Sequence, residues 1–160
     1  MVGEWLAALE ATLLARALRD SVWVYPLVNA GHVAGVCLLV GSIIPLDLRL
    51  LGAWRSMPLA PLWRVLTRTA AAGLILAGIF GSLLFITRAT EYAASPFFIA
   101  KMIVVVLAIA NAIALRNVVP GGPEGIPAFG QPARRIRLAA GVSLLAWLAA
   151  LTLGRLVGYF

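Results

Sequence analysis

An uncharged run from Val22 to Leu46 places the strongest constraint on the structure of this chain. A helix over this run rises by about 1.5 Å per residue, so it would be roughly 37 Å long and would cross a hydrocarbon core of about 30 Å with some tilt. Because hydrocarbon offers no hydrogen-bond partners, single spanning segments of this length are α-helical. Further apolar runs, each interrupted by at most one basic residue, cover 69–87, 96–115 and 138–157. The sequence therefore predicts an all-α membrane protein with four transmembrane helices in a bundle, forming a single domain over 1–160.

The composition supports a membrane protein over a soluble one. The chain is 62% hydrophobic and 12% charged, whereas a soluble domain is about 45–50% apolar and about 25% charged. The net charge is +7, but the arginines lie between apolar runs, which is typical of membrane topology and contact with anionic headgroups. We therefore expect a lipid bilayer and not a nucleic acid as the partner. Cys37 is the single cysteine, so no internal disulfide and no zinc spacing is present.

Residues 1–21 precede the first span and carry too many charges to cross the membrane. Within them, Trp5, Leu9 and Leu13 recur at helical spacing. An apolar stripe opposite charged residues is typical of a helix that lies flat at the membrane surface. The sequence therefore predicts an N-terminal amphipathic interfacial helix.

Charged residues mark the predicted ends of the spans. Pro45, Asp47 and Arg49 close the first span, and 52–68 is interpreted as a short loop. The stretch 117–132 is rich in proline and glycine, which predicts an irregular loop. Counted with their flanking residues, over 49–68 and 116–137, the two connections together carry eight arginines against four on the opposite side. The positive-inside rule therefore places both loops in the cytoplasm. Both termini are then expected in the periplasm, with the protein in a bacterial inner membrane.

Small residues recur at intervals of four in two of the predicted spans. Gly31 and Gly35 form one such pair, and Gly73, Ala77 and Gly81 form a longer series. Small residues at this spacing allow the backbones of two membrane helices to approach closely. We interpret these positions as helix-packing seams that favour a homo-oligomer or a larger membrane complex.

A polar stripe interrupts the first span. Tyr25, Asn29 and His32 are spaced i, i+4, i+7 and share one helical face. Ionisable side chains within spans are costly and usually face the protein interior or a wet cavity. With the predicted topology, Arg88 and Lys101 lie in the same outer half of the bundle. We therefore predict an outer-leaflet polar pocket that binds a small ligand, a lipid, a quinone or a partner helix, formed by Tyr25, Asn29, His32, Arg88, Lys101 and Asn111.

Structural roles for the same residues are the competing interpretation. His32 can be a neutral side chain bonded to a neighbouring helix, and Lys101 can extend towards the headgroups. Asn111 lies deeper in the third span, where an amide commonly joins two helices.

A b-type haem is the sharpest alternative function. His32 is the single histidine, so two histidine ligands within one copy are excluded. Ligation by His32 with Met102, or by His32 from two copies, is the haem alternative. Copper needs several His, Met or Cys ligands, and the candidates here are scattered along the chain. We predict no metal centre.

A small oligomeric transporter of protons or solutes, using His32, is the other alternative. No Ser/His/Asp set and no phosphate-binding glycine motif is present in the sequence. The sequence therefore indicates a non-enzymatic membrane protein or a subunit of a larger membrane complex.

Several short motifs stand out along the chain. They are Trp23-x-Tyr25-Pro26-x-x-Asn29-x-x-His32-Val33-x-Gly35, Gly41-Ser42, Asp47-Leu48-Arg49-Leu50-Leu51-Gly52, Phe97-Phe98-x-x-Lys101-Met102 and Asn111. In these motifs the chain resembles a family of small bacterial four-helix integral membrane proteins of unknown function. It distantly resembles the membrane domain of copper-resistance D type proteins, whose expected metal ligands are not matched here. The resemblance implies the fold and the membrane location, and it implies no activity.

Overall fold

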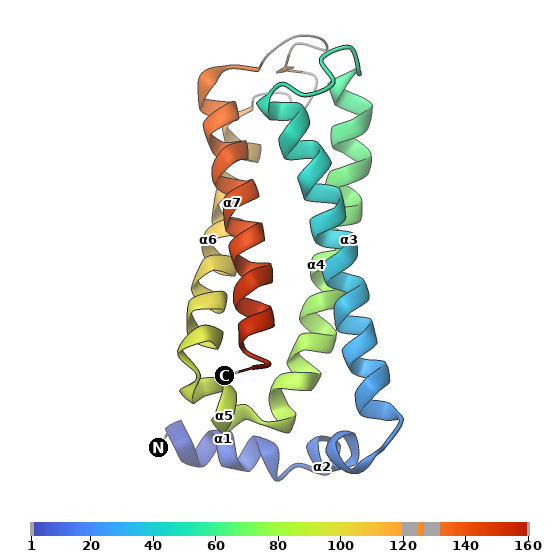
Figure 1. Ribbon diagram of the computed structural model, residues 1–160, viewed down its shortest axis with the longest axis vertical. Coiled ribbons are helices and arrows are strands. Elements are labelled where there is room, and N and C mark those ends of the chain that lie inside the picture. The colour runs from blue at the N-terminus through green and yellow to red at the C-terminus, as the bar shows by residue number, and fades with distance from the viewer. Residues whose placement is uncertain (1, 120–124, 127–131, 160) are drawn as a thin grey trace.

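Four long helices lie side by side in the computed structural model, which describes residues 2–119, 125–126 and 132–159 (Figure 1). All regular structure in these ranges is helical, and four helices are long and apolar enough to cross a membrane. The predictions of helical structure and of four long apolar helices are thus confirmed for the part of the chain that the structure describes. The helices are α1 (Val2–Glu10), α2 (Leu13–Asp20), α3 (Val24–Leu51), α4 (Leu59–Thr87), α5 (Ala89–Ala94), α6 (Pro96–Val118) and α7 (Arg134–Leu156).

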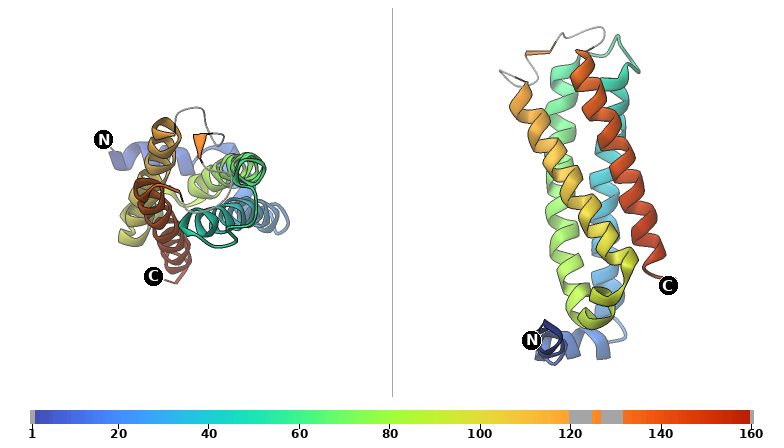
Figure 2. Two further views of the ribbon diagram at one scale, coloured as in Figure 1. Left: turned by 90° about the horizontal axis from the view of Figure 1, so that it is seen from above. Right: turned by 90° about the vertical axis from the view of Figure 1, so that its left-hand side faces the viewer.

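The two ends of the molecule differ in what they carry. Both chain termini, α1, α2 and α5 gather at one end, here called the terminal end (Figures 1 and 2). The connection between α3 and α4 and the start of α7 lie at the opposite end, here called the loop end. Most of the predicted loop over 117–132 lies outside the described residues.

The N-terminal segment forms two helices where the sequence predicted one. α1 and α2 lie across the terminal end of the long helices (Figure 1). The break falls at Thr12, whose hydroxyl donates to the carbonyl of Leu9 and accepts from the N–H of Ala15. A threonine side chain that bonds the backbone in this way caps a new helix instead of continuing the old one.

The helix that contains the predicted span 22–46 is longer than that span, because α3 continues through Pro45 to Leu51. The helix ends at Gly52, which has a φ of 117° and donates its N–H to the carbonyls of Leu48 and Arg49. A glycine in the left-handed region is a common helix C-cap. Pro45 removes one backbone donor without stopping the helix.

The longer helix changes the setting of two charged residues. Asp47 is 4% exposed and Arg49 is 0% exposed, so they are buried inside the protein and not boundary anchors. The Nε and Nη2 atoms of Arg49 donate to the carbonyl of Met57 at 3.1 and 3.0 Å. Arg49 therefore ties the chain between α3 and α4 to the end of α3.

The predicted loop over 52–68 is also too long, since α4 begins at Leu59. Pro58 is the N-cap, and Pro61 lies in the first turn, where a missing N–H costs no helical hydrogen bond. The prediction was wrong because charge marks the limit of hydrocarbon and not the limit of a helix. As a result Arg64 and Arg68 stand on a helix, one turn apart.

The two small-residue seams face each other within the chain. α3 packs most extensively on α4, α6 packs on α7, and α3 also contacts α7. A Cβ added at Gly73 would lie 2.5 Å from the backbone nitrogen of Leu39, and one at Gly35 would collide with the backbone of Ala77. The seams thus explain the α3–α4 contact, and an oligomer stays a prediction.

Replacing Gly35 by alanine should lower the free energy of unfolding by about 1–3 kcal/mol, because the added methyl group forces α3 and α4 apart. Gly41 is the matched control on the same helix, since an added Cβ there meets nothing within 4 Å. Thermal unfolding followed by circular dichroism in detergent measures both variants. Equal midpoints for Gly35→Ala and Gly41→Ala would contradict the close contact.

Candidate functional site

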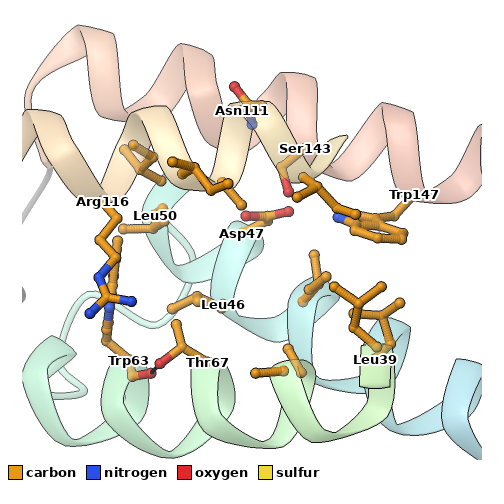
Figure 3. Close-up of a pocket in the computed structure, with 18 of the residues that line it drawn as sticks. Leu39, Leu46, Asp47, Leu50, Trp63, Thr67, Asn111, Arg116, Ser143 and Trp147 are labelled. Carbon is orange, nitrogen blue, oxygen red and sulfur yellow. Dashed lines mark hydrogen bonds between the residues drawn. The ribbon is translucent and has the colours of Figure 1, made fainter. Parts of the chain in front are cut away.

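A cavity of about 720 Å³ lies in the loop-end half, between all four long helices (Figure 3). α4 and α6 are not among the extensively packed helix pairs. The lining includes Ala71 on α4 and Ile113 on α6, and both residues are exposed. The cavity therefore opens sideways between α4 and α6, in the direction that a surrounding bilayer would occupy.

Asp47 is the acid in the lining of this cavity. It projects from α3 and shares a hydrogen bond with Ser143 on α7, which is also buried. Its Oδ2 atom is buried and has no hydrogen-bond partner. A buried oxygen in this state costs about 1–3 kcal/mol unless a partner is supplied from elsewhere.

Trp147 provides the complementary atom. It lies one helical turn beyond Ser143 on α7 and lines the same cavity. Its Nε1 atom is buried without a hydrogen-bond partner, and the indole nitrogen points towards Asp47 (Figure 3). One wall of the cavity thus presents an acceptor and a donor that the described chain leaves unpaired.

Asn111 borders the same cavity from α6 (Figure 3). Its Nδ2 atom donates to the carbonyl of Ala139 on α7 at 3.0 Å. The amide therefore joins α6 to α7, which is the structural role considered for it. Of the residues predicted to form the outer pocket, it is the one that lines this cavity.

Three arginines line the loop-end part of the cavity. Arg64 and Arg68 come from α4, Arg116 comes from α6, and all are exposed. The side chain of Arg116 extends from α6 towards Trp63 and Thr67 on α4 (Figure 3). Guanidinium groups therefore stand on both sides of the opening.

His32 makes a specific contact in the terminal-end half. Its Nδ1 atom lies 2.8 Å from the carbonyl of Ala77, so this nitrogen carries the proton and donates it. A Cβ added at Gly81 would lie 3.0 Å from the imidazole. His32 thus joins α3 to α4 beside the small-residue seam. Lys101 lies close enough to His32 for the two side chains to interact electrostatically. The Nζ atom of Lys101 lies 5.1 Å from the ring centre of Phe98.

The other predicted site residues lie at the terminal-end surface. Tyr25 shares a hydrogen bond with Tyr92 of α5. Arg88 pairs with Glu91 at 3.3 Å, with both side chains exposed, and Asn29 is exposed on α3. The structure therefore places the predicted residues in separate groups, with Tyr25 beside Tyr92, His32 near Lys101, and Asn111 at the loop-end cavity.

Met102, the second residue of the haem alternative, is 43% exposed. It lies with Ile103, Val106 and Leu107 on a shallow patch that α6 forms alone. Among the described residues, no group of three or more His, Cys, Asp or Glu side chains is arranged to hold a metal ion. Haem ligation through His32 stays a prediction.

The sequence analysis missed the residues of the cavity wall. Asp47 was assigned to a membrane boundary, while Ser143 and Trp147 were not considered for a site. One sequence feature indicates them: Ser143 and Trp147 are polar and spaced i, i+4 within a span.

Comparison of the chain with protein-family models, curated proteins and solved structures finds no match. The residues and their geometry therefore carry the functional conclusions below.

Replacing Asp47 by leucine together with Ser143 by alanine should raise the free energy of unfolding in detergent by about 1–3 kcal/mol, because the pair of substitutions removes the buried oxygen without a partner and leaves no unpaired hydroxyl behind. Asp20→Leu is the control, since Asp20 is exposed on α2. Its replacement should change the free energy of unfolding little. Thermal unfolding of the two variants and the wild type measures the effect. A lower midpoint for Asp47→Leu/Ser143→Ala than for the wild type would contradict this account of Asp47.

The phenol of Tyr92 provides a test at the terminal end. Burial first, and then the charge and hydrogen bond of Tyr25, raise the pKa of Tyr92. The folded state therefore holds this proton longer than the unfolded state, and folding stability falls as pH rises above about 10, the ordinary tyrosine value. Tyr25→Phe should lower the pKa of Tyr92, measured by an absorbance titration of the phenolate. Tyr159→Phe is the control and should leave the pKa of Tyr92 unchanged. An unchanged pKa of Tyr92 in Tyr25→Phe would rule out the hydrogen bond between Tyr25 and Tyr92.

Proposed function

We propose that this protein is a helical-bundle membrane protein that binds a lipophilic molecule in its loop-end cavity, with entry from the bilayer between α4 and α6. The buried Oδ2 atom of Asp47, which faces a largely apolar cavity without a partner, carries this proposal. A bound molecule that donates a hydrogen bond to this oxygen satisfies it.

The surface supports membrane placement of the bundle. Trp5 is 75% exposed on α1 and Leu13 is 86% exposed on α2, as expected for an N-terminal pair of helices whose apolar side chains enter the membrane interface. The outward faces of the long helices likewise carry many exposed aliphatic side chains.

Arginine supports one orientation of the bundle in a bacterial inner membrane. Most arginines belong to the loop end, including Arg64, Arg68 and Arg116 at the cavity. The positive-inside rule then directs the loop end to the cytoplasm and both termini to the periplasm. In this orientation the cavity opens into the cytoplasmic leaflet. An outer-leaflet pocket around His32 stays a second proposal, which only the proximity of Lys101 supports.

The cavity favours a ligand with an apolar body and one polar group. Its volume falls in the range of about 300–1,000 Å³ that is common for small-molecule sites. Asp47 offers an acceptor and Trp147 offers a donor, and a hydroxyl group satisfies both at once. Lipids and reduced quinones combine such a group with a long hydrocarbon part.

Binding without catalysis fits this arrangement best. The acid of the cavity is bonded to Ser143, while the imidazole of His32 is engaged with Ala77 in the other half. No observed contact favours haem ligation or transport. We also propose, on the motifs given above, that the chain belongs with the small bacterial four-helix membrane proteins that it resembles, as a subunit or an oligomer.

A long-chain alcohol with bromine on its chain tests the proposal, because bromine quenches tryptophan fluorescence on contact. The protein keeps Trp147 as its only tryptophan, and the other tryptophans are replaced by phenylalanine. Quenching should saturate, and Asp47→Leu should weaken the apparent affinity about tenfold, since the hydrogen bond to the buried Oδ2 atom is lost.

Asn29→Leu is the matched control, because Asn29 is exposed at the other end of α3. Its quenching curve should match that of the parent protein. Absence of saturable quenching, or equal affinity in Asp47→Leu, would reject the cavity as the binding site. The unfolding midpoint of each variant separates loss of binding from loss of folding.

A further inference from the structure

Two of the three arginines at the cavity opening, Arg68 and Arg116, have no partner among the described residues. Within the described ranges, Arg68 and Arg116 take part in no hydrogen bond or ion pair, although both line the cavity. Arg68 stands on α4 and Arg116 on α6, so the two arginines line the cavity from the two helices that flank its opening. Arg64 adds a third positive charge one turn from Arg68.

The cavity is therefore amphipathic. Its walls are largely aliphatic, its opening at the loop end is cationic, and its single acid, Asp47, is buried and bonded to Ser143. A guanidinium group presents a planar fork of donors that matches phosphate oxygens in a two-point contact. Charge complementarity thus selects an anionic group at the opening and hydrocarbon inside.

The level at which the arginines lie in the membrane indicates where that anion comes from. Arg116 lies in the last turns of α6, and Arg64 lies near the start of α4. Trp63 lies beside them in the lining, and tryptophan is typical of the headgroup level. A phospholipid in the adjacent leaflet carries its phosphate at this level and its chains at the level of the apolar walls.

We infer that the occupant of the cavity is an anionic phospholipid, with one chain inside the cavity and its phosphate held between Arg68 and Arg116 across the α4–α6 opening. This inference rests on the proposed function and adds the headgroup chemistry to it. A hydroxyl group close to the phosphate is then the group that meets Asp47.

Chain-brominated phosphatidylglycerol and phosphatidylcholine, compared at equal mole fraction in phosphatidylcholine nanodiscs, test the inference through quenching of Trp147. The first lipid is anionic and carries hydroxyl groups, whereas the second is zwitterionic. Phosphatidylglycerol should reach half-maximal quenching at a mole fraction about tenfold lower, because two guanidinium groups act on its charge. The double variant Arg68→Gln/Arg116→Gln should lose this preference, so that the two lipids reach half-maximal quenching at the same mole fraction.

Arg135→Gln is the matched control, since Arg135 is an exposed arginine of the loop end that does not line the cavity. It should keep the full preference. Inorganic phosphate at millimolar concentration should also leave the preference intact, and its loss would mean that the arginines bind the free ion and would overturn the inference.

Equal quenching by the two lipids, with saturable quenching by the brominated alcohol, would overturn the inference and leave the proposed function standing. Absence of saturable quenching by any of these probes would overturn both. Native mass spectrometry of the unmodified chain gives a second measurement, in which phosphatidylglycerol should stay bound at collision energies that remove phosphatidylcholine.

Discussion

The backbone contact between α3 and α4 is the interaction on which the rest of the structure depends. Gly35, Gly73 and Ala77 bring the two helices so close that an added methyl group collides with backbone atoms. In hydrocarbon there is no hydrophobic force to hold helices together, so close packing and hydrogen bonds must do so. His32 adds a hydrogen bond to Ala77 along the same seam.

The cavity follows from how the other helices meet this pair. α6 packs on α7, and α7 packs on α3, so α4 and α6 are left as the outer members of the arrangement without an extensive contact of their own. The gap between them is bounded by Asp47 and Ser143 on its inner wall. A site between helix pairs therefore needs no loop to shape it.

The sequence was sufficient for the number and nature of the spans, because a long uncharged run has few alternatives to a membrane helix. It was insufficient for the helix ends. Pro45 suggested a boundary but lies inside α3, and the predicted loop over 52–68 includes residues that belong to α4. Burial of Asp47 depends on α7, which is distant in sequence, and no periodicity within the first span reveals that pairing.

The candidate site was harder to predict than the fold. Tyr25, Asn29 and His32 share a face as the spacing requires, yet Asn29 is exposed while His32 is engaged with α4. Helical spacing shows that side chains point to the same side of one helix. A site also depends on which neighbouring helices that side contacts. The sequence contained no information about the sideways gap between α4 and α6.

The anchoring of the α3–α4 connection by Arg49 has a mechanical consequence. Arg49 is fully buried and bonds the carbonyl of Met57 through two nitrogens, and the glycine seam clamps the same two helices lower down. α3 and α4 are thus held together at two places along their length and form one rigid helix pair. A change in the width of the gap would then require α6 to move relative to the α3–α4 pair, which it meets mainly through α7.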